Sequence, residues 1–480
     1  MYASANACEE VGSARDHRAG GARRLRLLPV IVALGFILPA IPLKAETLQE
    51  ALVLAYQGHP QLNAERARQR STDEGVPQAL AAYRPQINAS LSAGLLGVRN
   101  LLPDGEVQAA NLRSWSAGIT ASQTLFNGFR TGNSVRQAES QVFAGRETLR
   151  NVEQSVFLDV VTVYANVFAG NSLVEAQRIN VQFMRDTLAA TRKRQELGDV
   201  TPTDVAQAEA RFNRALADLN SAEVTFAINQ ATYSQVVGNA PGRLVAAEPI
   251  DQLLPPVRDQ AVAISRREHP AIVAANYDID VAQHAIRVAE GSLYPTVTLQ
   301  AQASRNVNTD TTLGTPRSDV ASVTTNATVP IYDGGLAASQ IRQGKEQLAQ
   351  VRAQLDRARG QIQSAVIAGW VTHEGAKIAV QAAQSEARAA DLALAGVQRE
   401  TRAGQRTTLD VLNAQQDLVA ARARLIQAQR DRVIASYTLL AAIGRLDHAR
   451  LALNTPDYSP QTHYHQVRDA WRGLRTPAGQ

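Results

Sequence analysis

Two short stretches of the chain contain Gly, Thr and Asp at the same spacing. They read "ELGDVTPTDV" at residues 196–205 and "RAGQRTTLDVLNAQ" at residues 402–415. In each stretch an Asp stands six residues after a Gly. The residues concerned are Gly198, Asp204, Gly404 and Asp410. Glycine tolerates the left-handed end of a helix, and a Thr followed three residues later by an acidic residue caps the next helix. Helix capping alone therefore explains both Asp residues at the level of the sequence.

Residue patterns typical of enzymes are missing from the sequence. It contains no nucleophile elbow, no metal-ligand spacing and no paired-carboxylate site, so we predict that the protein is not an enzyme. His463 and His465 lie close together near the C-terminus. Two histidines without a carboxylate or Cys cluster make a weak metal site, and we predict no metal and no cofactor. His59 and His269 each precede a proline at equivalent places, which indicates a repeated turn.

The two turns belong to a longer internal repeat. "GHP" at 58–60 returns as "EHP" at 268–270, which is 210 residues later. "LFNGF" at 125–129 returns as "IYDGG" at 331–335, and its offset of 206 residues also relates the two turns. A nearly constant offset across separate landmarks indicates that one unit is written twice. The predicted units are the repeats 46–250 and 251–446 and the C-terminal tail 447–480.

Residues 1–45 have the pattern of an export signal. Basic residues precede an apolar run at 27–43, and we predict cleavage after Ala45 or Ala40. A membrane anchor is the alternative, but the run contains three prolines. The only cysteine, Cys8, leaves with the signal, so the mature chain forms no disulfide. The mature chain keeps 43 basic and 41 acidic side chains, so the net charge of +5 does not indicate a nucleic-acid partner.

Four segments alternate between apolar and small polar residues, as strands with two different faces do. The predicted strands are about 86–98 and 112–126 in the first repeat and about 296–304 and 320–332 in the second. Their length suits a tilted membrane crossing of ~9–11 residues. A soluble sandwich is the alternative, although its core would carry larger side chains. Phe126, Trp115 and Tyr332 suit an aromatic girdle, with ordinary packing against helices as the alternative.

Long helices follow each pair of strands. We predict them at about 131–197, 202–237, 336–402 and 408–444. Apolar residues recur every seven positions in the first of them, which is typical of helices coiled on each other; they are Val135, Val142, Leu149, Val156 and Val163. A helix of this length spans about 100 Å, roughly three times the apolar thickness of a bilayer. Most of it must therefore stand outside the membrane.

Four strands cannot close a barrel, and open sheet edges are not tolerated in lipid. Several copies of the chain must then share one barrel. Three copies give twelve strands, which is an even number inside the range of outer-membrane barrels. Two copies give eight strands and an interior filled by side chains. Small polar residues on one face suit an open aqueous pore, so we favour the trimer.

These motifs resemble the TolC outer-membrane efflux proteins, particularly the type I secretion members. The resemblance rests on the duplicated unit, on the two helix turns, on "LFNGFRT" and "VPIYDGG" at the strand-to-helix junctions, and on "YSPQTHYHQVRDAWRG" at 458–473. The junction residues are Phe126, Asn127, Gly128, Tyr332, Asp333 and Gly334. The resemblance implies a mixed, mainly α fold: a homotrimer whose twelve-stranded outer-membrane β-barrel takes four strands from each chain and continues as a periplasmic α-helical coiled-coil barrel.

The resemblance also implies a function and partners. The protein is expected in the outer membrane of a Gram-negative bacterium, as the exit duct of a type I secretion or multidrug efflux system. Its expected partners are outer-membrane lipid, a periplasmic adaptor protein and, through the adaptor, an inner-membrane ABC exporter or proton-driven pump. A periplasmic coiled-coil adaptor or scaffold is the alternative function. The sequence leaves the transported substrate and the choice of pump open.

In the resembled family the helix tips close the tunnel between neighbouring protomers. Carried onto this sequence, the gate residues are Thr203, Asp204, Arg406, Asp410, Asn413 and Thr401. Thr401 stands where the family has a tyrosine and Asn413 where it has a second Asp, so we expect a looser gate. The tips also dock the adaptor. The residues at the matching positions are Leu197, Gly198, Asp199, Val200, Ala403, Gly404 and Gln405.

Overall fold

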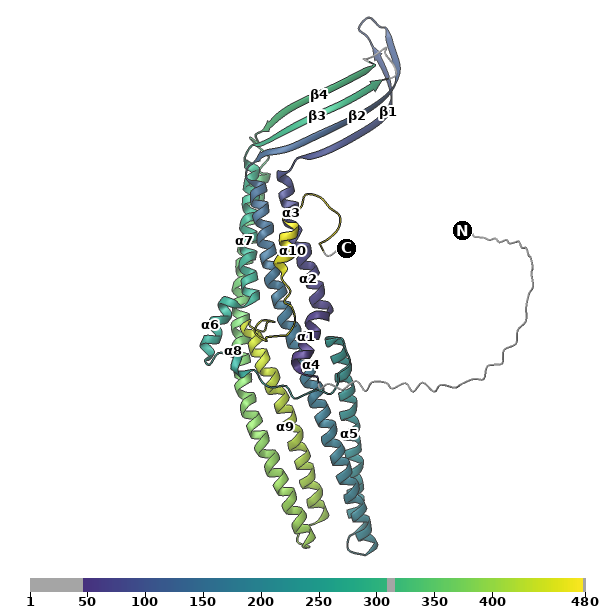
Figure 1. The fold of residues 1–480 in the computed structure, drawn as a ribbon, viewed down its shortest axis with the longest axis vertical. Coiled ribbons are helices and arrows are strands. Elements are labelled where there is room, and N and C mark those ends of the chain that lie inside the picture. The colour runs from purple at the N-terminus through teal and green to yellow at the C-terminus, as the bar shows by residue number, and fades with distance from the viewer. Residues whose placement is uncertain (1–45, 309–315, 478–480) are drawn as a thin grey trace, which may run out of the picture. The chain divides into compact units, whose positions relative to one another are not determined.

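The computed structural model describes residues 46–308 and 316–477. The predicted signal peptide at residues 1–45 lies outside this part. In the unit Lys44–Gln480, long helices accompany one four-stranded sheet (Figure 1). The prediction of a mainly helical fold with four strands is confirmed.

Each repeat places short helices before two strands and two long helices after them. The first repeat contains α1 (Leu48–Gly58), α2 (Pro60–Asp73), α3 (Gly75–Leu80), β1 (Gln86–Leu101), β2 (Val107–Asn127), α4 (Arg130–Glu196) and α5 (Pro202–Val237). The second contains α6 (Arg258–Glu268), α7 (Pro270–Glu290), β3 (Thr296–Asn308), β4 (Arg317–Thr328), α8 (Leu336–Arg402) and α9 (Thr408–Ile443). One further helix, α10 (Pro460–Val467), lies in the tail.

The sheet is antiparallel with strand order β1-β2-β3-β4. Successive side chains of a strand point to opposite faces, so the apolar positions of β1 share one face. On that face Ile87, Leu91 and Leu95 are 70, 79 and 81% exposed. In the described chain β1 and β4 are edge strands, each paired on one side only. A wide apolar face and two open edges require covering from outside this chain.

The last predicted strand was placed too far along the chain. It was expected to reach Tyr332, but β4 ends at Thr328. Pro330 has no N–H to donate to a neighbouring strand, so the ladder stops before it. Tyr332 consequently lies outside the sheet and is 88% exposed. The other strands run longer than expected, since β2 already begins at Val107.

The long helices pack in two hairpins, α4 with α5 and α8 with α9, and α4 also contacts α9. All five residues of the seven-residue repeat in α4 are buried. The largest cluster of buried side chains includes Phe157, Tyr164 and Tyr233. The Tyr233 hydroxyl donates to the Glu46 carboxylate at 2.6 Å, and the Tyr164 hydroxyl donates to the Glu46 carbonyl at 2.9 Å. The start of the described chain is thereby fixed to both helices of the first hairpin.

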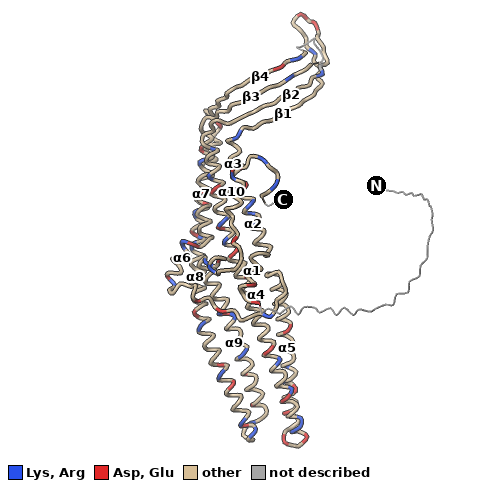
Figure 2. Tube along the Cα trace, in the orientation of Figure 1, with Lys and Arg blue, Asp and Glu red and all other residues tan. Residues whose placement is uncertain are grey.

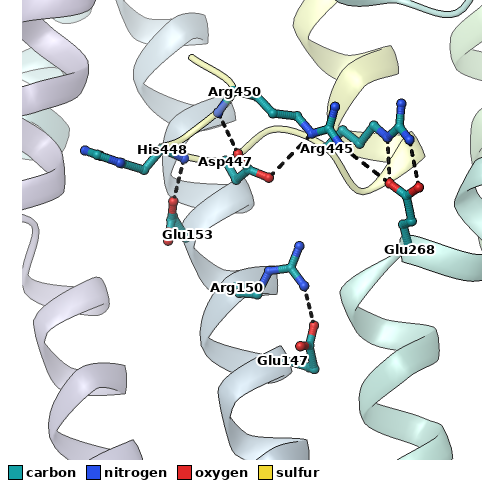
Figure 3. Close-up of polar contacts among 8 residues, drawn as sticks. All are labelled: Glu147, Arg150, Glu153, Glu268, Arg445, Asp447, His448 and Arg450. Atoms are coloured by element: carbon teal, nitrogen blue, oxygen red, sulfur yellow. Dashed lines mark hydrogen bonds and ion pairs between the residues drawn. The ribbon is translucent and has the colours of Figure 1, made fainter. Parts of the chain in front are cut away.

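Beyond α9, a connecting segment at 444–459 ties the two repeats together (Figure 3). Arg445 donates two hydrogen bonds of 2.7 Å to Glu268 at the end of α6. The N–H of His448 donates to Glu153 of α4 at 2.9 Å. Gly444 adopts φ +89°, and a Cβ there would lie 2.6 Å from the Cα of His269. A glycine is therefore required where α9 passes this corner.

The repeated histidine turns have one structure. His59 and His269 both precede a helix whose first residue is proline, with nearly identical backbone angles. The Nδ1 of His59 accepts from the Gln61 N–H, and the Nδ1 of His269 accepts from the Ala271 N–H, both at 3.2 Å. An accepting nitrogen must be unprotonated, and burial lowers the pKa of His269 to about 4. These histidines are helix caps.

Candidate gate at the helix tips

The two helix tips have the same backbone. Gly198 and Gly404 adopt φ +82° and +78°. In the first tip the Asp199 N–H donates to the Arg194 carbonyl at 2.9 Å, and in the second the Gln405 N–H donates to the Glu400 carbonyl at 2.9 Å. This bond satisfies a carbonyl at the end of the helix and turns the chain sharply. Both hairpins therefore end in one compact, glycine-dependent turn.

The two Asp residues complete capping boxes at the start of α5 and α9. The N–H and the hydroxyl of Thr201 donate to Oδ2 of Asp204 at 2.9 and 2.8 Å, and Thr407 donates to Asp410 at the same distances. The hydroxyl and then the N–H of Thr201 lower the pKa of Asp204. The N–H and then the hydroxyl of Thr407 lower the pKa of Asp410. Both carboxylates are ionised at neutral pH.

Capping leaves these carboxylates able to bind a second partner. Both capping bonds go to Oδ2, and within the described residues no hydrogen bond to Oδ1 of Asp204 or Asp410 is found. Each Oδ1 can accept from a donor outside the chain. A cap and an intermolecular contact are therefore compatible at the same residue.

Arg406 pairs with a residue that sequence reasoning missed. Its Nε donates to Glu400 at 3.0 Å across the second tip, and both side chains are about half exposed. Among the described residues Arg406 is thus joined to its own tip, with no bond to Thr203 or Asp204. Arg194 links the two tips instead, donating to the Thr408 hydroxyl at 3.4 Å. The sequence signal that could have predicted this pair is the six-residue spacing of Glu400 and Arg406 across the turn.

The two positions that depart from the family pattern are engaged within the chain. The Thr401 hydroxyl donates to the Val397 carbonyl one turn earlier at 2.7 Å. The Asn413 side chain accepts from Arg211 of α5 at 3.1 Å, and Gln416 accepts from the same guanidinium. Arg211 therefore joins the first hairpin to the second. The sequence carries no signal for it, because the partners are about 200 residues apart on exposed faces.

The predicted docking residues lie at the tips, and all of them are exposed to solvent except the half-buried Val200. Leu197 is 78% exposed. No heavy atom lies within 4 Å of where a Cβ would be at Gly198 or Gly404, so the backbone angle rather than space demands glycine there. Because the tip is exposed, a partner can reach its backbone closely.

Strand-to-helix junctions lie at the other end of the long helices. Asp333 accepts from the Gly335 N–H at 2.9 Å and from the Ala337 N–H at 2.7 Å, which caps α8. Asn127 accepts from the Thr131 N–H of α4 at 3.4 Å in the equivalent way, and its Nδ2 also donates to the Thr131 hydroxyl at 2.7 Å. Gly128 has φ +66°, and a Cβ there would meet the Gly291 carbonyl oxygen at 2.2 Å. The remaining predicted junction residues are Phe126, Tyr332 and Gly334, of which Gly334 has φ +70°.

No metal site is found among the residues that the structure describes, where no group of three His, Cys, Asp or Glu side chains comes together. His463 binds elsewhere: its Nδ1 lies 3.0 Å from the buried Asp73 carboxylate of α2. This contact and the burial of Tyr464 dock α10 on the first repeat. Of the two conspicuous histidines of the tail, His463 therefore has a structural partner.

A sheet with one apolar face, joined to helices that reach about 100 Å to charged tips, is the fold of an outer-membrane channel. The sequence profile of the outer membrane efflux protein family matches residues 51–239 and 262–445. The chain belongs to this family. It is located in the outer membrane and serves as an efflux channel, and the alternative of a periplasmic adaptor is set aside.

Relatives and solved structures agree with this assignment. The outer membrane efflux protein BepC of Brucella suis is 42% identical over 93% of this chain and 95% of its own length. Protein CyaE of Bordetella pertussis is 27% identical over 87% of this chain and 88% of its own. The crystal structure of the Campylobacter jejuni CmeC outer membrane channel has the same fold, with a TM-score of 0.74 at 14% identity over 88% of this chain and 89% of that one.

Proposed function

We propose that three copies of this chain form the passive exit duct of a tripartite export system, closed at its periplasmic end by the helix tips. The observation that carries the proposal is the open four-stranded sheet with an exposed apolar face. Three such sheets, joined β4 to β1, would make a closed twelve-stranded barrel in which every edge is paired. Small polar side chains of the opposite face would line its lumen.

In the proposed closed state the tips meet around the threefold axis. Arg406 would exchange Glu400 of its own tip for Asp204 and Thr203 of the next protomer. The free Oδ1 of Asp204 is the acceptor that this exchange requires. Three Asp410 carboxylates would converge on the bore and favour cations there. Arg211 holds Asn413 and Gln416, which ties each α9 to the α5 of its own protomer.

The partners follow from the same arrangement. The exposed turns around Gly198 and Gly404 are proposed to dock a periplasmic adaptor, which would connect the duct to an inner-membrane ABC exporter or proton-driven pump. One relative is named an outer membrane efflux protein, and another, from Pseudomonas aeruginosa, is an alkaline protease secretion protein. We propose that the cargo is of one of these two classes, a small toxic molecule or a secreted protein.

Deleting the first strand pair tests this function. A variant without residues 86–125 retains the helical hairpins and loses half of the sheet. The expected result is a protein that reaches the periplasm but neither inserts into the outer membrane nor conducts ions in planar bilayers. Insertion and conductance of the native kind in this variant would overturn the proposal, because the barrel would then not depend on these strands.

A further inference from the structure

The apolar face of the sheet carries a group of arginines toward the strand ends farthest from the helices. The pairing register places residues of different strands in rows, and partners in a row share a face. One row contains Leu91, Ala117, Arg305 and Asp319. The next row on the same face contains Ala93, Trp115, Val307 and Arg317. Charged side chains are thus continuous with the surface that faces lipid.

Two guanidinium groups share one carboxylate in these rows. Arg305 donates from Nε to Oδ1 of Asp319 at 2.6 Å and from Nη2 to Oδ2 at 3.3 Å. Arg317 donates to Oδ2 from Nε at 3.0 Å and from Nη2 at 2.6 Å. The three side chains are 50, 56 and 49% exposed. The cluster keeps a net positive charge and can make contacts on its outer side.

Two further arginines extend this group across the first strand pair. Arg99 is eight residues from Leu91 on β1, and Arg113 pairs with Leu95, so both lie on the apolar face. We call Arg99, Arg113, Arg305 and Arg317 the arginine group. Figure 2 shows uncharged strand along most of the sheet, with the charges gathered toward the far ends. The acidic residues Asp104 and Glu106 lie in the turn beyond the paired rows.

We propose that the arginine group binds the phosphate groups of an anionic lipid in the outer leaflet, whose acyl chains lie along Leu91, Leu95 and Ile119. Asp319 engages Nε and Nη2 of Arg305 and Arg317, so the outer Nη1–Nη2 edge of each guanidinium is the fork that can match a phosphate bidentately. An arginine on the lipid face is tolerated near the interface and not at the bilayer centre. The adjoining apolar residues fit the other half of an amphipathic lipid. This inference rests on the proposed function, in which these strand ends face outward.

The test uses the full-length trimer in detergent, with diphosphoryl lipid A as the probe and phosphatidylcholine as the neutral comparison. Native mass spectrometry counts retained lipids, and a bilayer recording of each sample reports the channel. We expect the native trimer to retain lipid A in preference to phosphatidylcholine. The double variant Arg305→Gln/Arg317→Gln should lose about tenfold or more in lipid A affinity while still conducting. Arg258→Gln/Arg267→Gln at exposed positions of α6 removes the same charge away from the sheet and should change nothing.

A second variant guards against failure of the first to assemble. Arg305→Lys/Arg317→Lys keeps the charge and lacks the fork, so its lipid A affinity should fall by about threefold or more. Unchanged lipid A binding in a conducting Lys variant would overturn the inference and leave the channel function intact. Competition by millimolar inorganic phosphate as effective as that by lipid A would also overturn it, since the apolar half of the site would then contribute nothing. A protein that neither assembles nor conducts in its native form would refute the proposed function instead.

Discussion

The helices α4 and α8 are equivalent copies with unequal surroundings. Each is 67 residues long, and they are offset by 206 residues. Of their residues, 23 are buried in α4 and nine in α8. Within the chain α4 contacts α1, α2, α3, α5, α7 and α9, whereas α8 contacts mainly α6, α7 and α9 among the described helices. Helix α4 is therefore packed on most sides by its own chain, whereas α8 has a face that its own chain does not cover.

The uncovered face of α8 is apolar. Val371, Ile378 and Leu392 are 63, 67 and 72% exposed. The residues 206 positions earlier in α4 are Ala165, Ser172 and Asp186. Because α8 carries large apolar side chains where α4 has smaller or charged ones, we propose that this face of α8 packs against a neighbouring copy.

The largest effect is expected from making α8 like α4. Leu392→Asp places in α8 the residue that α4 has at the equivalent position. Each of three interfaces would lose about 2 kcal/mol of apolar burial and would also have to desolvate a carboxylate. We expect dissociation to monomers, measured by sedimentation in detergent. The reverse exchange in α4, Asp186→Leu, is the matched control and should leave the trimer intact. An undisturbed Leu392→Asp trimer would contradict the assigned face.

The second test compares the two tips. Arg406→Ser removes the charged donor that we propose closes the tunnel, at about 1–3 kcal/mol for a bond between charged groups. Single-channel conductance in planar bilayers should rise, and the trimer should remain stable. Arg194→Ser at the first tip removes a contact within the chain and should raise conductance less. Equal conductance in native protein and Arg406→Ser would remove Arg406 from the gate.

The third test concerns the junction where the repeats are tied together. Burial and then the nearby Asp447 and Asp457 carboxylates raise the pKa of Glu153 to about 7 from 4.5, against a hydrogen bond from His448. Between these values the folded protein holds a proton that the unfolded chain has released, so stability falls as pH rises through this window. Glu153→Gln has no proton to lose at this position. Its free energy of unfolding should exceed that of the native protein by at most about 3 kcal/mol at pH 8, and the two should be equal near pH 4.5.

The Glu153→Gln test measures the thermal unfolding midpoint of the trimer as a function of pH. Glu147→Gln is the control, six residues away on the same helix, where Glu147 pairs with Arg150 at 2.8 Å (Figure 3). This control should shift the midpoint by the same small amount at every pH. A pH-independent difference between Glu153→Gln and native protein would show that Glu153 is ionised in the fold.

The smallest effect is expected from Asp410→Asn. The amide oxygen still accepts the capping bonds, so the helix loses about 1 kcal/mol or less. The bore would lose three negative charges, and cation selectivity measured as a reversal potential should weaken. Asp204→Asn at the other tip keeps Asp410 and should preserve the selectivity. Identical reversal potentials in native protein and Asp410→Asn would reduce Asp410 to a cap.

Local sequence patterns predicted the helices and strands. They did not predict contacts between residues that are far apart in the sequence. The alternation of apolar and polar residues predicted the strands, and the glycines predicted the turns at the helix tips. Both signals come from residues that are neighbours in the sequence. The error at Tyr332 came from extending alternation past Pro330. Arg211 was missed because its partners Asn413 and Gln416 come from the other hairpin. Glu153 looks like any surface glutamate until the connecting segment covers it.

The mass of the detergent-extracted protein tests the central claim most directly. We infer three copies in one channel from the four strands per chain, the two open sheet edges and the bare face of α8. Native mass spectrometry of the purified protein should give a mass of three mature chains, and only that fraction should conduct ions in planar bilayers. A stable monomer that conducts as well as the unfractionated protein would contradict it.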